Sequence, residues 1–193
     1  MKMAKNPNQM GWYFNENNCI ACRACEAGCK AEFDLPVGVQ RRRVIIKEEG
    51  KYPDVKVRYI SAACNHCEEP SCLKACPVAA ITKEPEFGVV LINQEKCIGC
   101  RQCEAACPYR APTFDEKKKK MDKCTFCYHR LKEGLPPACV RTCPGYSLWH
   151  AKLSDIDAQR VLPEIYRRPL KDTLPGFADT KLTIPSVRFS EIK

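Results

Sequence analysis

The sequence has no long hydrophobic run. None of its windows approaches about eighteen consecutive apolar residues, so we expect no membrane-spanning helix. The first eleven residues contain lysines but neither an apolar signal-peptide core nor a twin-arginine pair. We therefore expect a soluble chain without a targeting signal of its own. Any attachment to a membrane is expected to come through a partner.

The motifs of several enzyme classes are missing as well. The chain has no glycine-rich nucleotide fingerprint and no Ser/His/Asp set for nucleophilic catalysis. The Cys-x3-Cys-x2-Cys signature of radical enzymes also occurs nowhere. We predict that the chain is not an enzyme by itself.

Cysteine is abundant, with 16 of the 193 residues. Such a composition is typical of secreted disulfide scaffolds and of metal proteins. Most of these cysteines lie two or three residues from the next, a spacing that hinders relaxed disulfide geometry but suits a shared metal centre. The spacing therefore favours metal binding.

Two of the four cysteine groups have the spacing Cys-x2-Cys-x2-Cys-x3-Cys, which is that of the bacterial ferredoxin run. The segments CIACRACEAGC and CIGCRQCEAAC agree at eight of eleven positions, so they form an internal repeat. Proline follows the second copy. Group one is Cys19, Cys22, Cys25 and Cys29, and group three is Cys97, Cys100, Cys103 and Cys107.

The other two groups have longer gaps, and each is followed by proline. Group two has two extra residues in its middle gap, and group four has eleven residues between its second and third cysteines. Taken alone, group four could be a zinc ribbon. Beside three ferredoxin-like runs, iron is favoured. Group two is Cys64, Cys67, Cys72 and Cys76, and group four is Cys124, Cys127, Cys139 and Cys143.

The spacing has a geometric reason. Two-residue gaps let a tight loop wrap three thiolates around one face of a cubane, with backbone N–H groups directed at its sulfurs. We expect the fourth cysteine in the first turn of a helix, where it ligates the other cluster of a pair. All sixteen positions are cysteine, so we predict four complete [4Fe-4S] clusters and no open iron site. His66, between two cysteines, is expected either to support a site or to lie at the surface, and not to ligate iron.

The formal charge of +9 could suggest a nucleic-acid partner. Four oxidised clusters with their thiolates contribute about −8, which leaves about +1. The basic excess is therefore mostly counter-charge for cofactors, and we expect no nucleic-acid binding. The run Lys117–Lys120 is expected to be a solvated hairpin tip.

Between the cysteine groups the sequence predicts an α+β fold of short β-hairpins and helical turns. The expected strands are 12–14, 43–47 paired with 55–60, and 81–83 paired with 89–92. The aromatic residues of 12–14 are expected in the core. Four prolines after residue 162 break any long element, so the tail is expected to be an extended arm.

With these motifs identified, the chain resembles the four-cluster iron–sulfur subunits of the complex iron–sulfur molybdoenzymes, and most of all the dimethyl sulfoxide reductase and polysulfide reductase type. The resemblance covers nearly the whole chain. It is carried by SAACNHCEEPSCLKACP from Ser61, CIGCRQCEAACPY from Cys97 and KCTFCYHRLKEG from Lys123. The nitrate reductase branch has a tryptophan at one ligand position, and this chain does not.

The resemblance implies that groups one and four share two clusters and that groups two and three share the other two. It also implies tandem ferredoxin-like modules: an outer module of residues 1–62 and 108–165, an inner module of 63–107, and a tail of 166–193. The implied ligand sets are Cys19, Cys22, Cys25 and Cys143 (cluster 1), Cys29, Cys124, Cys127 and Cys139 (cluster 2), Cys64, Cys67, Cys72 and Cys107 (cluster 3), and Cys76, Cys97, Cys100 and Cys103 (cluster 4).

The function implied by the resemblance is electron relay during anaerobic respiration. Family members connect a membrane quinol-oxidising subunit with a molybdopterin catalytic subunit, and the tail would dock on the catalytic partner. The bacterial inner membrane is the implied location, on the periplasmic side if a partner with a twin-arginine signal exports the complex, otherwise in the cytoplasm. A polyferredoxin-type subunit of a hydrogenase or formate dehydrogenase complex is the alternative.

The resemblance does not assign the two arginines that occupy matching positions in the repeated loops, Arg23 and Arg101. They could raise cluster potentials or be solvated residues of a tight turn, and the sequence favours neither.

Overall fold

The computed structural model describes residues 6–164, 167–175 and 178–190, in which short strands and helices alternate as in an α+β protein. The helices are η1 (Glu16–Asn18), α1 (Ala24–Phe33), α2 (Ser71–Lys74), α3 (Gln102–Ala105), α4 (Tyr128–Lys132), α5 (Ala138–Arg141), α6 (Leu153–Asp157) and η3 (Thr180–Leu182). The strands are β1 (Met10–Phe14), β2 (Arg42–Glu49), β3 (Lys56–Ala63), β4 (Ile81–Lys83), β5 (Val90–Ile92), β6 (Thr113–Asp115), β7 (Lys120–Asp122), β8 (Leu148–Lys152), β9 (Leu170–Lys171) and β10 (Val187–Ser190).

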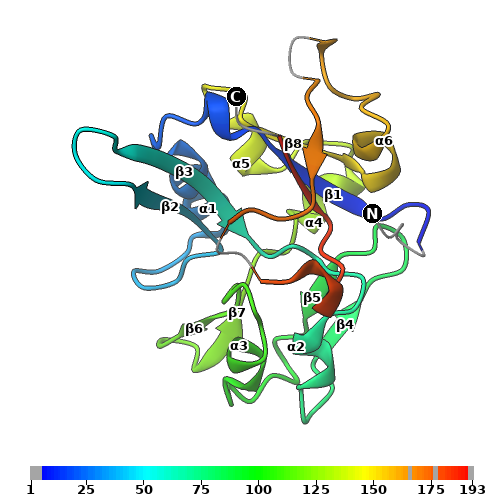
Figure 1. Ribbon diagram of the computed structural model, residues 1–193. Helices are drawn as coiled ribbons and strands as arrows, with labels where there is room; N and C mark the ends of the chain where they lie inside the picture. The colour runs from blue at the N-terminus through cyan, green and yellow to red at the C-terminus, as the bar shows by residue number, and fades with distance from the viewer. Residues whose placement is uncertain (1–5, 165–166, 176–177, 191–193) are drawn as a thin grey trace.

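The largest sheet joins the two ends of the chain. Its strand order is β8-β1-β10-β9, with β1 antiparallel to β8 and parallel to β10. Every residue of β1 is buried, which agrees with its unbroken apolar sequence MGWYF and with the expected core position of its aromatic residues. Figure 1 shows the N-terminal strand, in blue, beside the C-terminal strand, in red.

The C-terminal segment differs from the expected extended arm. After η3 the chain returns to the sheet as β10, whose side chains are at most 4% exposed. The preceding residues pair with the loop of group two, because the N–H groups of Glu68 and Glu69 donate to the carbonyls of Ile184 and Thr183. Prolines exclude a long element but not a four-residue strand. The partner of that strand lies at the other end of the chain, so the local sequence contains no sign of the pairing.

The expected hairpins are present. Strands β2 and β3 pair over their full length, and each is longer than expected, whereas β4 and β5 pair close to the expected bounds. A further hairpin, β6–β7, has residues 116–119 exposed at its tip, so most of the lysine run 117–120 is solvated as expected.

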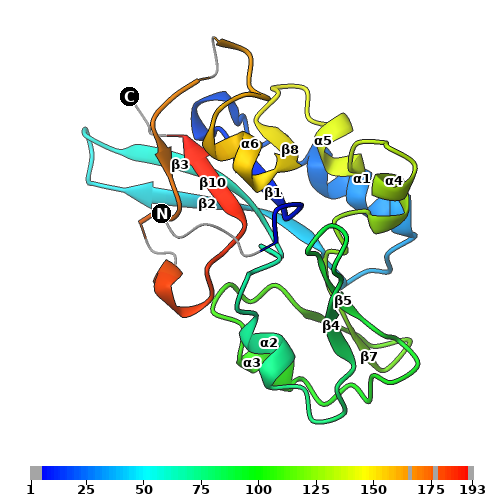
Figure 2. The same ribbon diagram turned by 90° about the vertical axis from the view of Figure 1, so that its right-hand side faces the viewer.

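The buried residues form separate cores. One lies between the large sheet, α1, α4 and α5, and another is built around α2, α3 and β4–β7. Figures 1 and 2 both show α2, α3 and the small hairpins grouped below the large sheet. Met121 and Phe114 of the β6–β7 hairpin pack in this second core. The hairpin thus lies with groups two and three, although the expected boundary after residue 107 assigns it to the outer module.

None of the helices in the described ranges is both long enough and apolar enough to cross a bilayer.

Candidate iron–sulfur sites

All four cysteine groups contain the same backbone turn. The residue immediately before the second cysteine has a positive φ in each group. This left-handed conformation costs a non-glycine residue about 1–2 kcal/mol. In three of the four groups the surrounding structure must therefore compensate for that cost. Where left-handed and right-handed residues alternate, successive N–H groups point into one concavity, which is a common anion site and is found around iron–sulfur clusters. Group four differs, because Cys127, the residue after Phe126, is left-handed too (φ 49°). The four residues are Ala21 (φ 55°), His66 (φ 43°), Gly99 (φ 71°) and Phe126 (φ 59°).

A second turn recurs after the last cysteine of groups two, three and four. In each, proline follows the cysteine and the third residue after the cysteine has a positive φ. The next N–H then donates to the cysteine sulfur, at 3.2 Å for Cys76, 3.5 Å for Cys107 and 3.3 Å for Cys143. Such hydrogen bonds stabilise a thiolate that binds metal.

The helices are placed differently from expectation. In every group the third cysteine, and not the fourth, is the second residue of a helix. This helix is α1 in group one, α2 in group two, α3 in group three and α5 in group four. The fourth cysteine follows the helix end in the groups that have proline, because a residue before proline is disfavoured in helical conformation. Group one has Lys30 at that position, so α1 continues to Phe33 and contains Cys29.

Gly99 is the one glycine among the four turn residues, and the structure explains why. A Cβ atom at this position would lie 2.3 Å from the backbone oxygen of Lys119 and 3.1 Å from the Phe114 ring. We expect Gly99→Ala to lower the free energy of unfolding by about 2 kcal/mol through overpacking, measured by thermal unfolding of the iron-loaded protein. Ala21→Gly, in the matching loop, is the control and should be nearly neutral. An unchanged melting temperature for Gly99→Ala would contradict this close approach.

The thiols of groups one and four lie near one another. Burial raises the pKa of the Cys19 thiol, and the neighbouring thiols of Cys25, Cys143 and Cys22 raise it further. The fourth cysteine of group one has different neighbours. Burial raises the pKa of Cys29 to about 12, with contributions from Cys139 and Cys127 of group four. The contact between α1 and α5 brings these two groups together.

Groups two and three are interleaved in the same manner. Burial raises the pKa of Cys67 to about 12, and Cys64, Cys107 and Cys72 add to this increase. Burial likewise raises the pKa of Cys103 to about 11, with contributions from Cys97, Cys100 and Cys76. In both sets, three sulfurs come from one group and the fourth from its partner group.

The cysteines are all free thiols, and cavities lie among them. One small cavity, of about 20 Å³, has Cys19, Cys22, Cys25 and Cys143 in its lining. Another, also of about 20 Å³, has Cys76, Cys97, Cys100 and Cys103 in its lining. Cys22 and Cys100 are exposed, so each of these cavities lies near the protein surface.

A single metal ion does not fit these sulfurs. Within the described residues, no three His, Cys, Asp or Glu side chains converge closely enough to hold one ion. A zinc ion draws four thiolates to about 2.3 Å, whereas the thiolates of a cubane each bind a different iron and stay farther apart.

Two buried cations also fit an anionic cofactor. Arg42 is 4% exposed, and its Nε and Nη2 atoms have no hydrogen-bond partner among the described residues. Lys123 is 1% exposed, and its Nζ donates to the carbonyls of Val90 and Cys124. Within the described part of the chain neither cation has a carboxylate partner. Neither residue could be singled out from the sequence, because nothing in a local pattern distinguishes a buried lysine or arginine from a solvated one.

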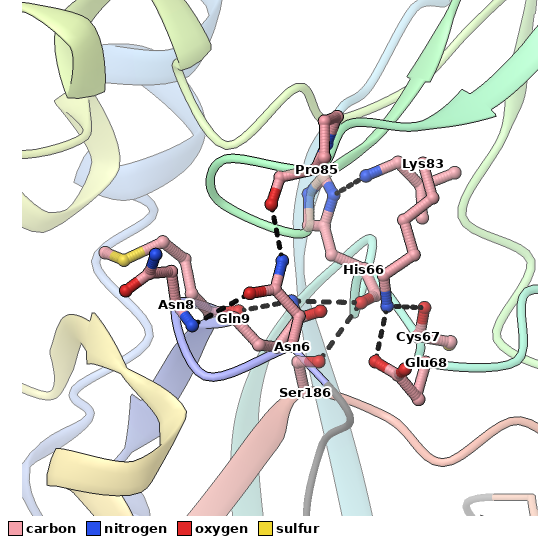
Figure 3. A network of polar contacts seen from close by, with 11 residues as sticks. Asn6, Asn8, Gln9, His66, Cys67, Glu68, Lys83, Pro85 and Ser186 are labelled. Atoms are coloured by element: carbon pink, nitrogen blue, oxygen red, sulfur yellow. Dashed lines mark hydrogen bonds and ion pairs between the residues drawn. The ribbon is translucent and has the colours of Figure 1, made fainter.

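His66 is buried, and its contacts are structural. Its Nδ1 accepts from the N–H of Val90 at 2.9 Å, and burial lowers its pKa well below the usual value, so the ring is neutral. Its carbonyl accepts from Gln9 at 3.4 Å and from Ser186 at 3.1 Å, which ties both chain ends to this loop (Figure 3). Lys83 bonds the next carbonyl, that of Cys67, as well as the Glu68 carboxylate. These contacts agree with the expected supporting role.

Arg23 and Arg101 are both more than half exposed and have carboxylate neighbours. Arg23 lies 3.7 Å from Glu26, and Arg101 lies 3.2 Å from Glu116 and over the Phe114 ring. Solvent and the carboxylates compensate their charges, so the structure favours the solvated interpretation over the tuning role.

Comparisons with known proteins agree with this chemistry. The model of the 4Fe-4S dicluster domain family matches residues 55–152. The B subunit of anaerobic dimethyl sulfoxide reductase from Haemophilus influenzae is 40% identical over 77% of this protein and 76% of its own length. The B subunit of the Escherichia coli reductase is 41% identical over 70% of each protein. The E. coli protein NrfC is 37% identical over 80% of this protein and 70% of its own length. The protein therefore belongs to the 4Fe-4S dicluster domain family, as an iron–sulfur subunit of the dimethyl sulfoxide reductase type.

Proposed function

We propose that this electron-transfer subunit holds four [4Fe-4S] clusters in a line, in tandem ferredoxin-like modules, on the ligand sets that the family resemblance implies. The main support is the interleaving of the thiols, in which three cysteines of one group meet the fourth of another. The positive φ before the second cysteine, which recurs in all four groups, also supports loops that direct N–H groups at an anionic cluster.

The order along the line follows from thiols of different sets that lie near one another. Cys25 neighbours Cys139, which relates cluster 1 to cluster 2. Cys124 neighbours Cys64, which relates cluster 2 to cluster 3. The thiol of Cys72 neighbours Cys103, which relates cluster 3 to cluster 4. The exposed Cys22 and Cys100 then belong to the two terminal sites, where electrons would enter and leave.

Side chains of the protein exclude water from this path and hold the cysteine loops in position. Each cluster supplies a centre that accepts and releases one electron. Trp12 and Phe126, both in the core beside the large sheet, stack with their ring centres 3.8 Å apart. Trp12 donates to the carbonyl of Cys64 at 3.1 Å, and His66 packs edge-on against Phe126. These rings exclude water between the second and third sites, so the charges there interact strongly.

The partners are a molybdopterin-containing catalytic subunit and a membrane-anchor subunit that oxidises quinol. The two reductase relatives favour a reductase subunit over the hydrogenase or formate dehydrogenase alternative. In such a complex this subunit has no substrate of its own. Its membrane association would come through the anchor subunit.

Anaerobic isolation of the complex tests the proposal. We expect about sixteen irons and sixteen sulfides per copy of this subunit, together with a co-purifying molybdopterin subunit. Zinc in place of iron, or an iron content near eight, would overturn the four-cluster assignment. A hydrogenase as the co-purifying partner would instead support the alternative.

A further inference from the structure

Residues 41–43, at the N-terminal end of β2, are three consecutive arginines. The middle one, Arg42, differs from its two neighbours in its contacts. Arg41 forms an ion pair with Asp122 at 2.9 Å. Arg43 donates to the carbonyls of Tyr109 and Arg110, both at 2.7 Å. Arg42, by contrast, points into the core beneath the large sheet and has no carboxylate partner among the described residues.

The contacts of Arg42 leave part of its guanidinium unsatisfied. Its Nη1 donates to the carbonyl and the hydroxyl of Ser61, at 3.2 Å and 3.1 Å, and its Cζ lies 4.7 Å from the centre of the Trp12 ring. The Nε and Nη2 atoms are buried without a partner. An uncompensated buried charge costs several kcal/mol, so a negative group is required nearby.

Ser61 links this arginine to one cysteine. Its hydroxyl oxygen lies 3.3 Å from the sulfur of Cys25. That oxygen accepts from Arg42, and its own hydrogen is left to donate to the sulfur. The hydroxyl therefore donates to Cys25 once this residue is a thiolate, and hydrogen bonds to cluster sulfurs raise the reduction potential.

Cysteines of groups one and four surround this arginine, and Cys25 is the one that Ser61 connects to it. Burial lowers the pKa of Arg42, but negative charge on Cys139, Cys124, Cys25 and Cys29, which belong to the ligand sets proposed for clusters 1 and 2, raises it. A fixed positive charge at this position stabilises the reduced cluster more than the oxidised one, because the reduced cluster carries one more negative charge.

We propose that Arg42 is a tuning residue that raises the reduction potentials of clusters 1 and 2, and that Ser61 extends its effect to the sulfur of Cys25. The inference rests on the proposed ligand sets. In this proposal, residues outside the cysteine loops set the reduction potentials of clusters 1 and 2.

Potentiometric titration of the intact complex, followed by electron paramagnetic resonance, tests the proposal. For Arg42→Gln we expect the oxidised-to-reduced ratio of clusters 1 and 2 to rise about tenfold at a fixed ambient potential, which is about 59 mV for a one-electron couple. Ser61→Ala should lower the potential of cluster 1 alone, and by less. Arg43→Gln is the matched control and should shift no potential, and Arg42→Lys should restore most of the wild-type values.

The results distinguish a failure of the tuning role from a failure of the proposed four-cluster function. Four clusters with unshifted potentials in Arg42→Gln would overturn the tuning role and leave the four-cluster assignment intact. Fewer than four clusters in the wild-type complex would overturn the proposed function itself. If Arg42→Gln assembles too little iron to titrate, Ser61→Ala decides: a lower potential for cluster 1 supports the proposal, and an unchanged one overturns it.

Discussion

Replacing Cys29 with alanine is expected to abolish the same paramagnetic signal as replacing Cys139, although these residues are far apart in the sequence. Replacing Cys25, only four residues from Cys29, should abolish a different signal. The reason is that the fourth cysteine of group one is turned toward group four, where its thiol neighbours Cys139 and Cys127. Alanine is the appropriate replacement, because a serine oxygen can still ligate iron.

Iron analysis and electron transfer complete this test. Each of these variants should retain about twelve of about sixteen irons, because one cubane of four is lost. Electron flow through the complex should fall by orders of magnitude in Cys29→Ala, since the second site is an interior position of the proposed line. If Cys29→Ala and Cys25→Ala abolish one common signal, each cysteine group binds its own cluster and the interleaved ligand sets are wrong.

Replacing Phe189 with alanine is expected to destabilise the whole subunit. Phe189 lies in β10, is 3% exposed and packs edge-on against Phe14 of β1, with ring centres 6.4 Å apart. Truncation of a buried phenylalanine costs about 3–5 kcal/mol. For a protein of this size, we expect the melting temperature of the isolated, iron-loaded subunit to fall by about 6–20 °C.

A matched control lies in the same tail. Leu182, in η3, is 64% exposed, and Leu182→Ala should leave the melting temperature unchanged. If the tail were only a docking arm, Phe189→Ala would weaken assembly of the complex without affecting the isolated subunit. A normal melting temperature for Phe189→Ala would therefore favour that simpler role over the structural one seen here.

The sequence by itself determined the chemistry of the sites. Ligand type, the two-residue gaps and the proline after three of the groups act within a few residues of one another, so they can be interpreted without knowledge of the fold. The same is true of the hairpins β2–β3 and β4–β5, whose strands are close in the chain. Group one shows how far such local reasoning extends, because Lys30 in place of proline accounts for the longer helix α1.

Only the tertiary structure decided which distant segments meet. It placed β10 beside β1, the β6–β7 hairpin in the core of groups two and three, and Arg42 among the thiols of groups one and four. None of these contacts lies within one local element, and their stability depends on burial and on compensation of charge. An arginine in a run of three, or a valine after several prolines, has no local feature that reports its burial, so these positions could not be predicted.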